Sequence, residues 1–167
     1  LGVGRGDEVI VPSFTHPADV NCIEAVGAIP KFCDIDPRTY TLSPRSLESK
    51  INDKTRAVIV VHLYGFAADM DRILEIANHN NLFVVEDCAQ ALGTLYRGKH
   101  VGTFGDFGIL SFFADKTITT GEGGMLITNN QDLLDEVNIY KHDGRRERGI
   151  DVIERLGYNF RITELQT

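Results

Sequence analysis

Short apolar runs alternate with amphipathic segments along this chain. The runs are rich in Val, Ile, Leu and Phe and predict strands at residues 7–14, 29–36, 55–65, 82–91, 104–116 and 123–129. The segments between them carry helix signals and predict helices at residues 17–28, 43–52, 69–81 and 130–144. Strands that alternate with helices in this way predict an α/β domain with a largely parallel sheet.

Local signals mark where several helices begin and end. Pro17 suits the first turn of the first helix, and Gly27 suits its end. Ser43 is placed to cap the second helix through its side-chain oxygen. The polar, glycine-flanked stretch at residues 142–157 predicts a surface loop with a solvated run of charges.

The length and charge of the chain limit its partners. Its 167 residues suit one domain, and the net charge of −7 argues against a nucleic acid partner. A small phosphate-bearing ligand stays open, because backbone donors can bind phosphate on an acidic protein. No run is long and apolar enough to span a membrane, and no secretory signal is visible. The three cysteines form no C-x-x-C motif, so we expect reduced thiols in a cytoplasmic protein without a metal site.

Reactive side chains follow the predicted strands. Ligands of an open parallel sheet bind outside the carboxyl ends of its strands, where we expect these side chains to meet. The residues placed there are Thr15, His16, His62, Tyr64, Glu86, Asp87, Gln90, Ser111, Asp115 and Lys116. His62 and Tyr64 could line a site, or could equally serve the core or an interface. Glu122, inside the glycine-rich turn at residues 121–124, receives no role.

Four of these residues match the needs of a pyridoxal phosphate site. Such a site needs a lysine for the covalent link, a carboxylate for the pyridine nitrogen, a flat group against the ring and a hydroxyl for the phosphate. Lys116, Asp87, His16 and Ser111 would fill these roles in that order. Singly, each has an ordinary alternative: Lys116 could point to water, Asp87 could cap a helix and Ser111 could lie in the core. Together at strand ends they favour a site.

Six sequence blocks resemble the DegT/DnrJ/EryC1/StrS sugar aminotransferases, and together they cover essentially the whole chain. The blocks are "GDEVIVPSFTHPADVNCI", "GAIPKFCDIDPRTYTL", "VHLYGFAADM", "VVEDCAQALGTLYRGKHVGTFGDFGILSF", "KTITTGEGGML" and "LGYNFRITELQ". The resemblance implies a three-layer α/β/α architecture, the large domain of pyridoxal phosphate-dependent transferases of fold type I. Residues 1–167 would form part of this cofactor-binding domain, with an N-terminal helix and a C-terminal small domain lying outside the chain.

The same resemblance implies a role for each site residue. Lys116 would bind the cofactor covalently and act in catalysis, Asp87 would pair with the pyridine nitrogen, and Gln90 would contact the ring hydroxyl. Ser111 would bind the phosphate. Asn159 would reach the phosphate of a neighbouring subunit, which implies a homodimer with shared active sites.

The resemblance also implies a reaction, with two departures from the family pattern. First, the family usually has Phe, Tyr or Trp where His16 stands. Second, the N-terminal helix and the C-terminal small domain, which help to bind cofactor and substrate in the family, lie outside this chain.

Lys116 argues against the branch of 3-dehydratases, which has histidine in its place. "KTITTGEGGM" is similar to the perosamine-forming branch, which aminates C4 of a nucleotide-linked keto-deoxy sugar, with L-glutamate as the expected donor. A regulatory, non-catalytic relative is the alternative, and a nucleotide-binding domain is disfavoured because no G-x-G-x-x-G follows the first strand.

Overall fold

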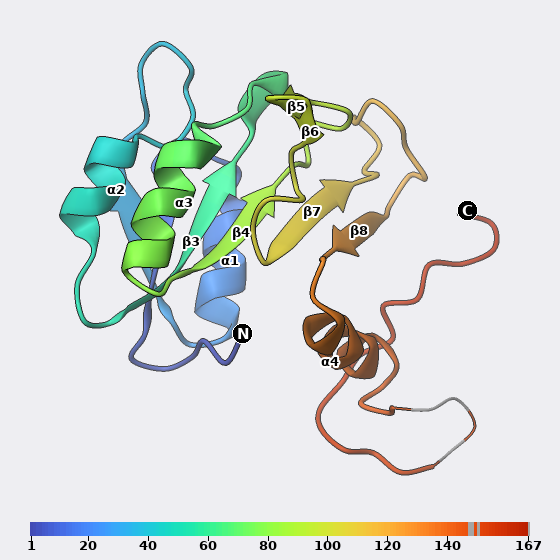
Figure 1. The fold of residues 1–167 in the computed structure, drawn as a ribbon. Helices are drawn as coiled ribbons and strands as arrows, with labels where there is room; N and C mark the ends of the chain where they lie inside the picture. The colour runs from blue at the N-terminus through green and yellow to red at the C-terminus, as the bar shows by residue number, and fades with distance from the viewer. Residues whose placement is uncertain (147–148, 150, 167) are drawn as a thin grey trace.

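Six strands form one sheet in the computed structural model, which describes residues 1–146, 149 and 151–166 (Figure 1). The strands are β1 (Glu8–Pro12), β2 (Ile29–Cys33), β3 (Thr55–Val61), β4 (Phe83–Asp87), β7 (Phe107–Ser111) and β8 (Gly124–Ile127). They lie in the order β2-β1-β3-β4-β7-β8, and all pairs are parallel except β7 with β8. The chain moves outward from β1 to β2 and then returns to β3 on the other side of β1. This reversal creates a crevice at the carboxyl edge of the sheet.

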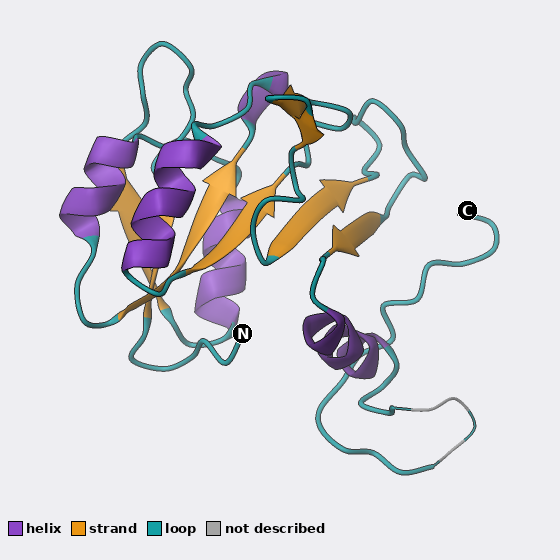
Figure 2. Cartoon of the chain, in the orientation of Figure 1, coloured by secondary structure: helices purple, strands orange, loops and turns teal. Residues whose placement is uncertain are grey.

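Helices cover both faces of the sheet and give the three layers that the sequence predicts. The helices are α1 (Pro17–Ala25), α2 (Pro44–Lys50), α3 (Met70–His79) and α4 (Gln131–Lys141), with a short 3-10 turn η1 (Leu63–Gly65). Figure 2 shows α2 and α3 together on one face and α1 on the other. Within β3, Val58 and Val60 join the core under α2 and α3, whereas Ile59 joins the core under α1. A strand with an apolar layer on each side needs the continuous apolar sequence seen at residues 55–61.

The predicted helix signals are confirmed. Pro17 is the first residue of α1, and Gly27 follows the helix with a positive φ of 77°. Ser43 caps α2 by accepting a hydrogen bond from the Ser46 N–H at 3.4 Å. In the described part of residues 142–157 the chain is irregular, as predicted for a surface loop. No helix among the described residues is both long and apolar enough to cross a bilayer.

The predicted strand at residues 104–116 is too long by several residues at each end. Strand β7 covers only Phe107–Ser111, and Lys116 lies in the loop beyond it. A small hairpin of β5 (Leu95–Tyr96) and β6 (Lys99–His100) was not predicted at all. Its two-residue turn places Arg97 and Gly98 at positive φ, which is the geometry of a tight hairpin turn.

A fully buried carboxylate holds the segment before β7 in place. Glu86, on β4, accepts hydrogen bonds from the N–H groups of Gly102, Phe104 and Gly105 at 2.7, 2.7 and 2.8 Å. His62 Nδ1 accepts from the Ala68 N–H at 3.1 Å, so Nε2 carries the hydrogen donated to Glu86 at 2.9 Å. Residues 102–105 therefore bend around the carboxylate instead of joining the sheet.

The hydrogen bonds to Glu86 decide the charge that this group carries. Burial by itself raises the pKa of Glu86, but the hydrogen bond from His62 and those from the Gly105 and Gly102 backbone outweigh it and lower the pKa. The carboxylate is thus held ionised and supplies acceptors for four donors.

We expect Glu86→Gln to destabilise the fold by about 3 kcal/mol, because an amide cannot accept from all four donors. Since the folded-state pKa of Glu86 lies below that of an unfolded glutamate, its stabilisation is present above the unfolded value and is lost as the pH falls through the folded one. Urea unfolding of wild type should therefore show a loss of stability below about pH 4.3, and the variant should show a shallower loss.

Glu75→Gln is the matched control for this prediction. Glu75 lies on α3 with a side chain 66% exposed and pairs with Arg72. Its replacement should change the free energy of unfolding by less than about 0.5 kcal/mol. Equal effects of the two substitutions would contradict the anchoring role of Glu86.

Candidate active site

A cavity of about 680 Å³ opens at the carboxyl edge of the sheet, where the crevice is expected. Its walls come from the segment after β1, the start of α1, the ends of β3, β4 and β7, and the loop between β7 and β8. The apolar lining includes Ile59, Val61, Leu63, Val85 and Ile109, and the polar lining includes Thr15, His16, Asp19, Asp87, Gln90, Ser111, Asp115 and Lys116. Five of the six predicted site residues thus line one cavity, and Asn159 is the exception.

Lys116 reaches the cavity from the loop that follows β7. Its side chain is 20% exposed, and Nζ lies 3.4 Å from the Asp115 carboxylate. The loop is held at both ends, since the Lys116 N–H donates to the Phe113 carbonyl and the Thr120 N–H donates to the Phe112 carbonyl. An amine held on a short, braced loop beside an apolar lining is suited to covalent chemistry with a carbonyl group.

Asp87 and Gln90 follow one another at the end of β4. Asp87 Oδ1 accepts from the Ala89 N–H at 2.8 Å, which fixes the carboxylate at the cavity wall. Gln90 Oε1 accepts from the Tyr64 N–H at 3.2 Å, which leaves the Nε2 amide as the end that can donate to a ligand. The pair therefore offers a carboxylate for a cation and a donor for an oxygen.

Ser111 ends β7 and lines the cavity together with Gly123. Its Oγ accepts from the Phe113 N–H at 3.3 Å, so the hydroxyl hydrogen can be donated elsewhere. A Cβ on Gly123, which also lines the cavity, would lie 2.3 Å from Thr120 Oγ1. A larger residue at this position would require the Thr120 side chain to move.

His16 stands where α1 begins and caps that helix. Its Nδ1 accepts from the Ala18 N–H at 3.2 Å, which sets the orientation of the ring. The imidazole is exposed toward the cavity rather than buried in the core. An imidazole ring held in this orientation at the cavity can lie flat against an aromatic ligand.

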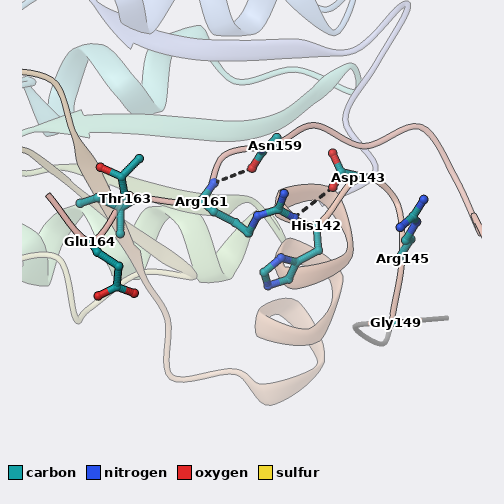
Figure 3. Close-up of a pocket in the computed structure, with 9 residues that line it drawn as sticks. His142, Asp143, Arg145, Gly149, Asn159, Arg161, Thr163 and Glu164 are labelled. Atoms are coloured by element: carbon teal, nitrogen blue, oxygen red, sulfur yellow. Dashed lines mark hydrogen bonds and ion pairs between the residues drawn. The ribbon is translucent and has the colours of Figure 1, made fainter. Parts of the chain in front are cut away.

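Asn159 lies in a different hollow, formed by the chain after α4 (Figure 3). It pairs with His142 through an isolated bridge, and its Oδ1 accepts from the Arg161 N–H at 3.4 Å. Arg161 in turn pairs with Asp143 at 3.0 Å. Within one chain Asn159 does not line the cavity of Lys116, and its role toward a neighbouring subunit stays a prediction.

His62 and Tyr64, left open by the sequence, do not line the cavity. His62 is fully buried against Glu86 and belongs to the anchor of the fold. Tyr64 is 67% exposed and contributes its backbone N–H to Gln90. Glu122 accepts through its carbonyl from Gln166 Nε2 at 2.7 Å, a contact between the lysine loop and the end of the described chain.

His62, Glu86 and Cys88 bring three metal-ligand atoms within 4.8 Å of one another. Both His62 nitrogens and both Glu86 oxygens already make hydrogen bonds. Burial, followed by the charges of Glu86 and Asp87, raises the pKa of the Cys88 thiol, which keeps it protonated and a poor ligand. These three residues therefore serve the fold.

Asp19 is the residue of this cavity that sequence reasoning missed. It lies in the first turn of α1, where an acidic residue already has a local explanation in the helix dipole. In the structure its carboxyl group accepts a hydrogen bond from the Thr15 hydroxyl and lines the same cavity as Asp87 and Lys116.

The residues of the cavity fit pyridoxal phosphate. The volume is within the range of cofactor pockets, and the apolar lining gives a surface for a flat ring. Lys116 supplies the amine, Asp87 the carboxylate and Ser111 a hydroxyl for an anion. The fit rests on the chemistry and common location of these side chains.

The comparisons with known proteins agree with this fit. The family model of the DegT/DnrJ/EryC1/StrS aminotransferase family matches residues 1–167. A GDP-perosamine synthase of Escherichia coli O157:H7 is 51% identical over 99% of the chain, and a pleiotropic regulatory protein of Geobacillus stearothermophilus is 43% identical over 99% of the chain. The chain spans 45% and 44% of the length of these two relatives, respectively, less than half of each.

Solved structures show the same relationship in three dimensions. An aminotransferase from Psychrobacter cryohalolentis superposes with a TM-score of 0.93 at 40% identity, over 98% of this chain and 44% of that one. A sugar aminotransferase of Streptococcus pneumoniae in its PMP form superposes with a TM-score of 0.90 at 30% identity, over 99% of this chain and 49% of that one. The chain belongs to the DegT/DnrJ/EryC1/StrS aminotransferase family.

Proposed function

We propose that this chain forms the cofactor-binding part of a pyridoxal phosphate-dependent aminotransferase, which transfers an amino group from L-glutamate to C4 of a GDP-linked keto-deoxy sugar. The observation that carries the proposal is the presence of Lys116 and Asp87 in one cavity at the carboxyl edge of the sheet. The similarity to a GDP-perosamine synthase supports the choice of sugar, and the PMP form of a structural relative supports the cofactor.

Three polar residues of the cavity, Lys116, Asp87 and Gln90, have defined tasks in this scheme. Pyridoxal phosphate, when bound, supplies an electron sink that stabilises negative charge on the carbon beside the amine. Lys116 would hold the cofactor between turnovers, and its Nζ would take a proton from the donor carbon and return one to the sugar carbon. Asp87 would keep the ring nitrogen protonated, and Gln90 would donate to the ring hydroxyl through Nε2.

The phosphate is the anionic end of the cofactor and needs donors from this chain. Ser111 offers its hydroxyl from the end of β7. Asn159 would add an amide from a second copy of the chain, because it lies outside the cavity of its own chain. The proposed enzyme is therefore a homodimer in which each subunit completes the other's site.

A non-catalytic regulatory role is the second candidate, and the similarity to a pleiotropic regulatory protein favours it. Such a protein would keep the fold and could keep the cofactor without turning over a sugar. The two candidates differ in one measurement, the appearance of amino sugar from L-glutamate and the GDP-linked keto-deoxy sugar, followed by mass spectrometry.

We expect wild type to develop a visible absorption band with pyridoxal phosphate that borohydride removes, and Lys116→Ala to develop none. Sugar amination by the variant should fall by roughly 10³-fold or more, because both the covalent link and the proton carrier are lost. Lys54→Ala, on an exposed turn, should keep the band and the rate. A lysine-independent band would contradict the proposed site.

Two substitutions at His16 should separate capping from stacking. Asn retains the cap of α1 but has no ring, so His16→Asn should leave stability within about 0.5 kcal/mol and weaken cofactor binding roughly three- to tenfold. Phe retains a ring but cannot cap, so His16→Phe should lose about 1 kcal/mol of stability and bind the cofactor no more weakly than wild type. Thermal unfolding and cofactor titration would measure both, and equal cofactor affinities in all three proteins would rule out stacking.

A further inference from the structure

We propose that Asp19 is a positioning residue of the cofactor site, a second carboxyl group whose negative charge adds to that of Asp87 beside the protonated ring nitrogen. The inference rests on the proposed function, because it concerns the binding of the same cofactor. It assigns a role to a side chain that the family resemblance leaves without one.

The placement of Asp19 follows from the packing of α1. The helix covers the face of the sheet that includes Val85, and strand alternation puts Asp87 on the same face. Asp19 lies in the first turn of the helix, and its carboxyl group is held by the Thr15 hydroxyl. Both carboxyl groups consequently line the cavity of Lys116.

The negative charge of Asp87 acts on the carboxyl group of Asp19. Burial, and after it the negative charge of Asp87, raise the pKa of Asp19 to about 6, against the opposing effects of the Thr15 hydrogen bond and His16. Below this pH Asp19 carries a proton, and above it Asp19 is ionised.

The other titratable groups of the cavity do not supply the negative charge that acts on Asp19. Burial raises the pKa of the Cys22 thiol, which keeps it neutral, and Asp115 lies against Lys116. His16 uses Nδ1 to accept from the Ala18 N–H. The group that acts on Asp19 as a neighbouring acid is Asp87.

A cation placed beside the pair changes its protonation. The protonated ring nitrogen favours the ionised form of Asp19, and by linkage the ionised form of Asp19 strengthens binding of the protonated ring by the same factor. This added attraction is fully present above about pH 6 and is lost as the pH falls below it and Asp19 takes up a proton. Asp19 thus makes cofactor affinity depend on pH.

The test is the dissociation constant of pyridoxal phosphate measured by absorbance from pH 5 to pH 8. For Asp19→Asn, the ratio of its constant to that of wild type should rise from about twofold at pH 5 to roughly tenfold at pH 8, which corresponds to one pKa unit of coupling. Asp19→Ser, which can still hydrogen-bond in a first turn, should behave in the same way. Asp132→Asn changes an exposed acid in the first turn of α4 and should follow wild type at every pH.

The outcomes separate this inference from the function on which it rests. A lysine-dependent band in wild type, with a variant ratio that does not change with pH, would overturn the role of Asp19 and leave the proposed function standing. Equal weakening at every pH would mean that Asp19 only supports the fold, which also overturns the inference. Absence of the band in wild type would overturn the proposed function itself.

Discussion

The buried carboxylate of Glu86 is the constraint on which the rest of this structure depends. It gathers backbone donors from residues 102–105 and the Nε2–H of His62, so it joins β4, the segment before β7 and the chain after β3. Successive residues of a strand face opposite sides of the sheet. Fixing Glu86 on one side therefore fixes Asp87 on the other, at the wall of the cavity. The edge of the sheet that carries the cavity is therefore held in place by a residue that does not line it.

The hydrogen bonds to Glu86 also require a close approach of backbone segments. Drawing residues 102–105 around one carboxylate brings them against β4 and β7, and side chains do not fit between. A Cβ at Gly105 would lie 2.5 Å from the Val84 carbonyl oxygen, and a Cβ at Gly108 would lie 2.1 Å from the Gly102 carbonyl oxygen. The glycines of this region serve that approach, whereas Gly123 serves the turn that carries the lysine loop.

The sequence predicted the features that neighbouring residues determine, and it did not predict those that depend on residues far away in the chain. Pro17 and Gly27 at the two ends of α1, the cap of α2 and the apolar run of β3 can be read from neighbouring residues, and they were predicted. The shortening of β7 could not be read in this way, because Glu86 lies 18 and 19 residues before the N–H groups of Phe104 and Gly105 that it binds. His62 looked like a site residue for the same reason. Nothing near it in sequence reveals that both its nitrogens are used in the core. The hairpin of β5 and β6 had a local signal, an Arg97–Gly98 turn, that was overlooked.

The position of Asp19 at the cavity was not predicted, because its place in the first turn of a helix already explains an acidic residue. An acid in the first turn of a helix is stabilised by the helix dipole wherever that helix lies. Here the crossover from β1 brings the first turn of α1 to the carboxyl edge of the sheet, so the same acid lines the cavity that Asp87 also lines. A cavity with two neighbouring carboxyl groups near α1 and β4 favours a cationic group there, and it directs an anionic group toward Ser111 and Gly123. The orientation of a ligand carrying both charges follows from this division of the cavity.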